Sequence, residues 1–138
     1  MKDWISLTKS VAMLSDYPKR GRRTGCIIKK SQRALSVGWN KHKNRIGVTV
    51  KDIMGISIRP TDHAETDAMN KLEPQELYGS EVIVLRLNGG ISMPCNRCLY
   101  NLIKAGVKSI TWEGGDGRIR TRRINGKTDP QSFISLYS

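Results

Sequence analysis

The sequence predicts a single α/β domain in which helices cover both faces of one mixed or parallel sheet. Strand-like apolar runs alternate along the chain with segments of helical periodicity, which is typical of a sheet sandwiched by helices. The most apolar strand, Glu81–Leu87, contains Val-Ile-Val-Leu and fits a central position covered on both sides. Because the 138 residues show no internal repeat and no linker, residues 1–138 are expected to form one domain.

The N-terminal third predicts a helix followed by a hairpin. Apolar residues recur at helical spacing between Trp4 and Leu14. This helix should end before Pro18, because the residue preceding a proline disfavours the helical region. The basic stretch Lys19–Gly25 is punctuated by glycine and predicts a loop. The hairpin that follows consists of a strand, a turn and a second strand: Cys26–Ile28, Ser31-Gln32 and Ala34–Val37.

The middle of the chain combines an irregular region with a helix. Residues Trp39–Asp62 show no firm element beyond a turn at Asp52–Gly55, and long loops of this kind are often functional. His63–Leu72 then fits a helix with Asp62 as its N-cap. The central strand comes next and is broken by Asn88-Gly89-Gly90.

The C-terminal part predicts two further strands between two helices. Cys95–Ala105 fits a helix with Pro94 at its start, where proline is tolerated, and Gly106 as its C-terminal cap. A strand, a turn and a charged edge strand follow: Val107–Trp112, Gly114–Gly117 and Arg118–Ile124. The last ten residues are expected to form a short docking helix.

Charge and hydropathy restrict the partners. The chain has 24 basic and 12 acidic residues, a net charge of +12, which favours an anionic partner such as a nucleotide, a nucleic acid or a phosphate-rich surface. Its longest apolar runs, such as Val82–Leu85, are four residues long, far below the roughly 20 needed to cross a bilayer. The start of the chain also lacks the apolar core of a signal peptide, so no membrane partner is expected.

The cysteines indicate a reducing compartment and a metal or redox role. There are three of them, and an odd number argues against a secreted disulfide framework. Cys95 and Cys98 are separated by two residues, too close for a routine structural disulfide. In a chain without a secretion signal such a pair is more often metal-binding or redox-active, so we expect a cytoplasmic protein.

Two short segments supply the ligands expected of a catalytic zinc. Such a zinc takes three protein ligands from nitrogen and sulfur and leaves a fourth position for water. His63, Cys95 and Cys98 provide one nitrogen and two sulfurs. If both segments begin helices on the same sheet face, the two N-terminal ends could converge on one Zn²⁺ ion and favour the thiolate form of the cysteines.

A closed structural zinc site is the main alternative, and it requires a fourth ligand. Only Cys26 and His42 remain to provide one. Cys26 lies in a predicted buried strand, where a small apolar side chain needs no other explanation. His42 stands between two lysines, which is more typical of a solvated loop.

Glu65 distinguishes a catalytic zinc site from a structural one. It follows His63 by two residues and therefore lies near the metal on a different side of the helical turn. This placement suits a proton carrier better than a ligand. Zinc lowers the pKa of its water to about 7, and Glu65 is the expected acceptor of that proton.

These residues form the pattern His-x-Glu…Pro-Cys-x-x-Cys, with apolar Leu102 four positions after Cys98. From about Gly25 to Trp112 the chain resembles the cytidine and deoxycytidylate deaminase superfamily. The resemblance implies a three-layer α/β/α cytidine-deaminase-like fold with a central mixed sheet of about five strands, a zinc cofactor and a homo-oligomer. It also implies hydrolytic deamination of a dCMP-like cytosine nucleotide to the uracil nucleotide and ammonia, with Glu65 carrying the proton.

The resemblance extends to the predicted substrate contacts. Asn40 in Gly38-Trp39-Asn40 matches the residue that contacts the nucleoside sugar. Arg22 or Arg23 matches the basic residue that holds the monophosphate in deoxycytidylate deaminases, and Ala64 completes the predicted set. Lys41 follows Asn40 where those enzymes usually have glycine, so no allosteric nucleotide site is carried over.

Two other functions remain open. Basic residues at Lys19–Arg23, Lys41–Arg45 and Arg118–Arg123 could form a track for single-stranded nucleic acid, making the protein a cytosine or adenine deaminase of DNA, RNA or tRNA. Met93 disfavours the tRNA enzyme, which typically has glutamate before Pro-Cys. A non-catalytic nucleic-acid-binding module would have no need of Glu65.

Overall fold

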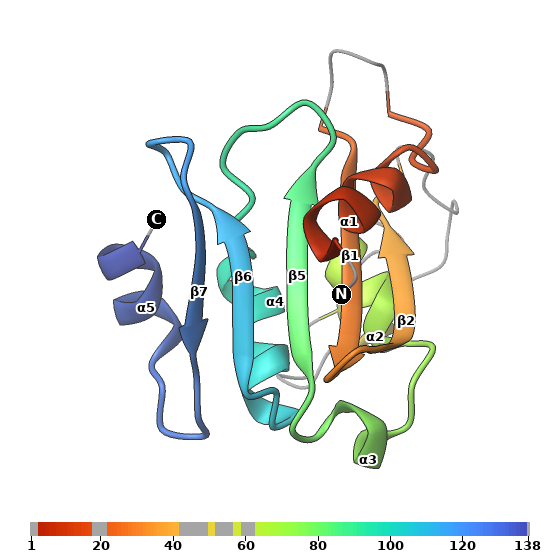
Figure 1. Ribbon diagram of the computed structural model, residues 1–138. Helices are drawn as coiled ribbons and strands as arrows, with labels where there is room; N and C mark the ends of the chain where they lie inside the picture. Colours follow the sequence, from red (N-terminus) through yellow and green to blue (C-terminus); the bar gives the residue numbers. More distant parts are fainter. Residues whose placement is uncertain (1–2, 18–21, 42–49, 52–56, 59–62, 138) are drawn as a thin grey trace.

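The computed structural model describes residues 3–17, 22–41, 50–51, 57–58 and 63–137. These residues form a five-stranded mixed sheet in the order β2-β1-β5-β6-β7 (Figure 1). Its strands are β1 (Thr24–Lys30), β2 (Arg33–Trp39), β5 (Glu81–Arg86), β6 (Ser109–Glu113) and β7 (Ile119–Arg123). A separate pair consists of β3 (Val50–Lys51) and β4 (Ser57–Ile58). The helices are α1 (Trp4–Ala12), α2 (Ala64–Met69), α3 (Pro74–Leu77), α4 (Asn96–Lys104) and α5 (Pro130–Tyr137).

The predicted fold class is confirmed. Strands β5 and β6 are parallel, as the helical crossover α4 between them requires, and the other neighbours in the sheet are antiparallel. Helix α1 lies on one face of the sheet, and α2 and α4 lie on the other (Figure 1). The apolar strand β5 occupies the middle of the sheet and the charged strand β7 its edge, both as predicted.

Two glycines in the hairpin allow helices to approach the sheet closely on opposite faces. A Cβ at Gly25 would lie 2.4 Å from the carbonyl oxygen of Thr8 in α1, and one at Gly38 would lie 2.3 Å from that of Ala64 in α2. No side chain fits at such distances. Strand β2 and helix α2 are further joined by a hydrogen bond from Ser36 Oγ to the Ala68 carbonyl, 2.8 Å long.

Several predicted boundaries are wrong. Helix α2 begins at Ala64 with His63, in extended conformation, at its N-cap; Asp62, predicted as the cap, lies outside the described residues, as does Asp52–Gly55. Pro94 is not the first residue of α4, because Cys95 is the N-cap and its thiol accepts the Cys98 N–H. Gly106 does follow α4 with a φ of 85°.

The C-terminal helix docks as expected. Phe133 of α5 is buried against Trp112 of β6, with ring centroids 5.4 Å apart. Ile124, just after β7, is buried in the same core as these two rings. This apolar contact secures the end of the chain to the sheet.

Candidate active site

Helices α2 and α4 begin at one place and bring three metal-ligand side chains together. His63 is the N-cap of α2, Cys95 is the N-cap of α4, and Cys98 lies in the first turn of α4. Their ligand atoms all lie within 4.8 Å of one another, and Cys95 Sγ is 3.9 Å from His63 Nδ1. The predicted convergence of two helix N-termini is therefore present.

The donor set fits zinc. One imidazole nitrogen and two sulfurs are ligands that Zn²⁺ prefers, and three protein ligands are the number used by catalytic sites. Within the described residues no fourth histidine, cysteine or carboxylate joins this group. Cys26 is buried in β1 outside it, and burial raises the pKa of its thiol. His42 lies outside the described residues.

The two ligand thiols have pKa values shifted in opposite directions. A hydrogen bond from Cys98, with a further one from His63, lowers the pKa of Cys95 to about 4. The same hydrogen bond, together with burial, raises the pKa of Cys98. A divalent cation coordinated by both sulfurs would favour two thiolates. The positive N-terminal end of α4 acts in the same direction.

Glu65 is a buried carboxylate beside these ligands. Only 4% of its surface is exposed, and burial raises its pKa, although the neighbouring His63 acts in the opposite direction. A carboxyl group whose pKa is raised exchanges a proton more readily in both directions, as acceptor and as donor.

A cavity of about 350 Å³ connects the ligands to the end of the sheet. Six of the eight predicted site residues line it: Arg22, Asn40, His63, Ala64, Glu65 and Cys95. Cys98 lies in the wall behind them, 3% exposed. Arg23 is turned away, since its Nε donates a hydrogen bond of 2.6 Å to the Tyr17 carbonyl.

The cavity also contains residues that the sequence did not single out as site residues: Tyr17, Thr24, Val84, Arg86, Ile91, Ser92 and Met93. Most come from the ends of β1 and β5 or from the connection between β5 and α4. Val84 and Arg86 are two positions apart in a strand and therefore lie on the same face of the sheet. This pattern identifies them as cavity residues only when the face that carries the site is known.

Asn40 closes the end of the hairpin that borders the cavity. Its Oδ1 accepts the Thr24 N–H at 2.9 Å, and its Nδ2 donates to the Arg22 carbonyl at 2.6 Å. The backbone N–H of Asn40 also donates to the Thr24 carbonyl. Asn40 thus fixes the backbone that carries Arg22.

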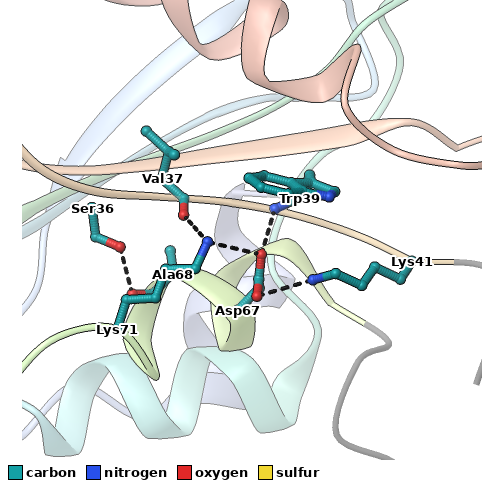
Figure 2. Close-up of polar contacts among 7 residues, drawn as sticks. All are labelled: Ser36, Val37, Trp39, Lys41, Asp67, Ala68 and Lys71. Atoms are coloured by element: carbon teal, nitrogen blue, oxygen red, sulfur yellow. Dashed lines mark hydrogen bonds and ion pairs between the residues drawn. The ribbon is translucent and has the colours of Figure 1, made fainter. Parts of the chain in front are cut away.

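A charged cluster joins the end of β2 to α2 (Figure 2). The carboxylate of Asp67 accepts the Trp39 N–H at 3.1 Å and forms ion pairs with Lys41 at 3.0 Å and Lys71 at 3.4 Å. Lys71 also donates to the Val37 carbonyl at 2.8 Å. This cluster holds the residue preceding Asn40 against the helix that begins at the metal ligands.

The sequence profile of the cytidine and deoxycytidylate deaminase zinc-binding region matches residues 2–113. The chain belongs to this deaminase family. Zinc is accordingly its cofactor, and the cluster of His63, Cys95 and Cys98 is the group that can hold it. No curated protein matches the chain at a significant level.

Solved structures support the deaminase fold. The dCMP deaminase of the cyanophage S-TIM5 is similar in its apo form (TM-score 0.53) and in complex with dCMP and dUMP (TM-score 0.54). Both are 24% identical to this deaminase and cover 80% of it, over 82% and 81% of their own chains. RibD of Acinetobacter baumannii, at 21% identity and a TM-score of 0.52, matches 78% of this chain over 26% of its own.

Across the part of this deaminase that the structure describes, no helix combines the length and the apolar character needed to span a membrane.

Proposed function

We propose that this zinc-dependent deaminase converts a cytosine nucleotide resembling dCMP into the uracil nucleotide and ammonia. The observation that carries the proposal is the buried carboxylate of Glu65, which shares one cavity with the zinc ligands. A structural zinc site has no use for a buried acid whose pKa is raised. The complex of the cyanophage dCMP deaminase with dCMP and dUMP supports a nucleotide as substrate.

The chemistry is hydrolytic and is divided between zinc and Glu65. Zinc, when bound, acts as a Lewis acid that makes water a stronger acid and a better nucleophile. Glu65 accepts a proton from the attacking water and delivers it to ring nitrogen N3. The water oxygen bonds to C4 as the C4=N3 double bond opens and N3 takes the proton. The proton remaining on the new hydroxyl then passes through Glu65 to the exocyclic amine, and as C4=O forms the carbon–nitrogen bond breaks and ammonia leaves.

The remaining cavity residues bind and orient the nucleotide. Ala64, between His63 and Glu65, offers only a small side chain at the start of α2, so the base can approach both neighbours. Asn40 is proposed to contact the sugar, and Arg22 the phosphate. The cavity volume of about 350 Å³ lies near the lower end of the range for ligand cavities, about 300 Å³. A homo-oligomer stays a prediction.

Ammonia release tests the proposal. The zinc-loaded protein is incubated with cytidine, deoxycytidine, their mono- and triphosphates and single-stranded oligonucleotides. Wild type is expected to favour a monophosphate, and Glu65→Gln should lose at least about 100-fold in kcat while retaining zinc. Asp116→Asn is the matched control, because it removes an acid from the β6–β7 turn, away from the cavity. Full activity of Glu65→Gln would contradict the assigned role.

The net charge of +12 favours single-stranded nucleic acid as a second candidate substrate. The described basic residues do not form a single group, since β7 and β2 are opposite edges of the sheet and Lys41 follows β2. Activity on an oligonucleotide should fall steeply as salt rises, whereas activity on a mononucleotide should change little. Efficient, steeply salt-dependent deamination of oligonucleotides would favour this second candidate.

A further inference from the structure

Arg86 is a cavity residue that neither the family pattern nor the zinc chemistry uses. It is the last residue of β5 and pairs with Thr24 of β1. Side chains alternate along a strand, so Arg86 lies on the same face as Val84, and both line the cavity together with Thr24. The guanidinium therefore stands at the sheet end of the cavity that holds the zinc ligands.

This half-buried guanidinium is incompletely hydrogen-bonded within the described residues. Its Nε is enclosed without a hydrogen-bond partner, and within the described residues Arg86 makes no ion pair. The nearby carboxylate of Glu113 instead accepts the Gly90 N–H at 2.6 Å. Leaving an enclosed polar nitrogen without a partner is costly, and such groups in native proteins often mark a functional site.

A second arginine lines the same cavity. Arg22 precedes β1, and its carbonyl accepts hydrogen bonds from Thr24 Oγ1 at 2.8 Å and Asn40 Nδ2 at 2.6 Å. These bonds fix the backbone of Arg22 beside the pairing partner of Arg86. The cavity wall thus contains two arginines, and Glu65 is its one carboxylate among the described residues.

We infer that Arg86, together with Arg22, forms a phosphate-binding subsite, and that Arg86 makes the enzyme select a nucleoside monophosphate over the free nucleoside. This inference rests on the proposed function. Two guanidinium groups present planar, forked donors that match phosphate oxygens better than any other anion-binding side chain. The phosphate is a terminal monoester, because a cavity of about 350 Å³ has the size typical of a site for one small ligand.

A binding measurement tests the subsite without catalysis. Thermal unfolding of the zinc-loaded protein is followed with and without inorganic phosphate. A ligand that binds the folded state raises Tm, so wild type should shift upward and Arg86→Gln should shift much less. Arg123→Gln, which removes an equal charge from the exposed strand β7, should shift as wild type does. Equal shifts in all three proteins would overturn the subsite.

A kinetic comparison tests selectivity. Arg86→Gln should lower kcat/KM for dCMP by roughly 10- to 100-fold, the effect of losing a charged hydrogen bond, and should change that for deoxycytidine less than about twofold. Arg86→Lys keeps the positive charge but loses the planar, forked arrangement of N–H donors. Its kcat/KM for dCMP should lie between those of wild type and Arg86→Gln. Arg123→Gln should alter neither value.

The other outcomes separate the hypotheses. Equal losses on dCMP and deoxycytidine would show that Arg86 acts only on structure and would overturn the inference. A loss confined to oligonucleotides would overturn the assignment to a monoester. If wild type releases ammonia from no substrate, the proposed function fails, while the phosphate-induced Tm shift still decides whether Arg86 binds the anion.

Discussion

Both faces of the sheet are packed against a helix in the same way, but only one of them carries the candidate active site. On each face a glycine of the hairpin, Gly25 or Gly38, lets a helix backbone approach to a distance that no side chain would allow. Helix α1 uses this approach only to cover β1 and β5, and contributes no residue to the cavity. Helix α2 uses it to hold its N-terminus, with His63 and Glu65, over the end of the sheet. Close packing therefore contributes to the site on the face where a helix begins, since the first turn of that helix offers both side-chain ligands and unpaired N–H groups.

The largest expected effect comes from adding a methyl group at these glycines. Gly38→Ala and Gly25→Ala should each lower the free energy of unfolding by about 1–3 kcal/mol, because the helix must move away. Only Gly38→Ala should also weaken zinc binding in the folded protein, since the obstructed carbonyl belongs to Ala64, next to His63. Chemical denaturation and chelator competition measure the two effects. If both substitutions weakened zinc binding equally, the two faces of the sheet would not differ in their connection to the metal site.

A smaller effect is expected from the charged cluster on the α2 face. Asp67→Asn keeps an acceptor for the Trp39 N–H but loses the charge that pairs with Lys41 and Lys71. We expect a loss of about 1 kcal/mol in stability and a several-fold rise in KM through Asn40, with kcat little changed.

The matched control for Asp67→Asn is the ion pair between Asp116 of the β6–β7 turn and Arg120 of β7. Asp116→Asn removes the partner of Arg120, and it should leave KM and zinc affinity as in wild type. A change in KM of the same size in both variants would show that the Asp67 cluster has no specific connection to the substrate site.

The features that the sequence predicted correctly each depend on a short stretch of neighbouring residues. The apolar run of β5 and the metal-binding pattern are contained in short segments, so the sequence was sufficient for both. Helix α3 was missed although Pro74 lies at its first position and Glu73 and Glu76 form a capping box, which is a recognised start signal.

Other residues could not be placed without the pairing of the strands. Arg22 and Arg23 are adjacent, and a shift of one residue changes the face of the sheet, so only the structure separates the cavity residue from the one bound to Tyr17. Arg86 could be assigned to the cavity only from the pairing of β5 with β1, whose register places it opposite Thr24. Such non-local relations are absent from any single segment.

The ligand environment of zinc tests the central claim most directly, because a catalytic site keeps a position open that a structural site fills. X-ray absorption at the zinc edge of the loaded protein should show two sulfurs at about 2.3 Å, one imidazole nitrogen at about 2.0–2.1 Å and one further light atom from water. That result would match His63, Cys95 and Cys98 as the complete protein ligand set. A third sulfur or a second imidazole would instead show a closed structural site and contradict the account.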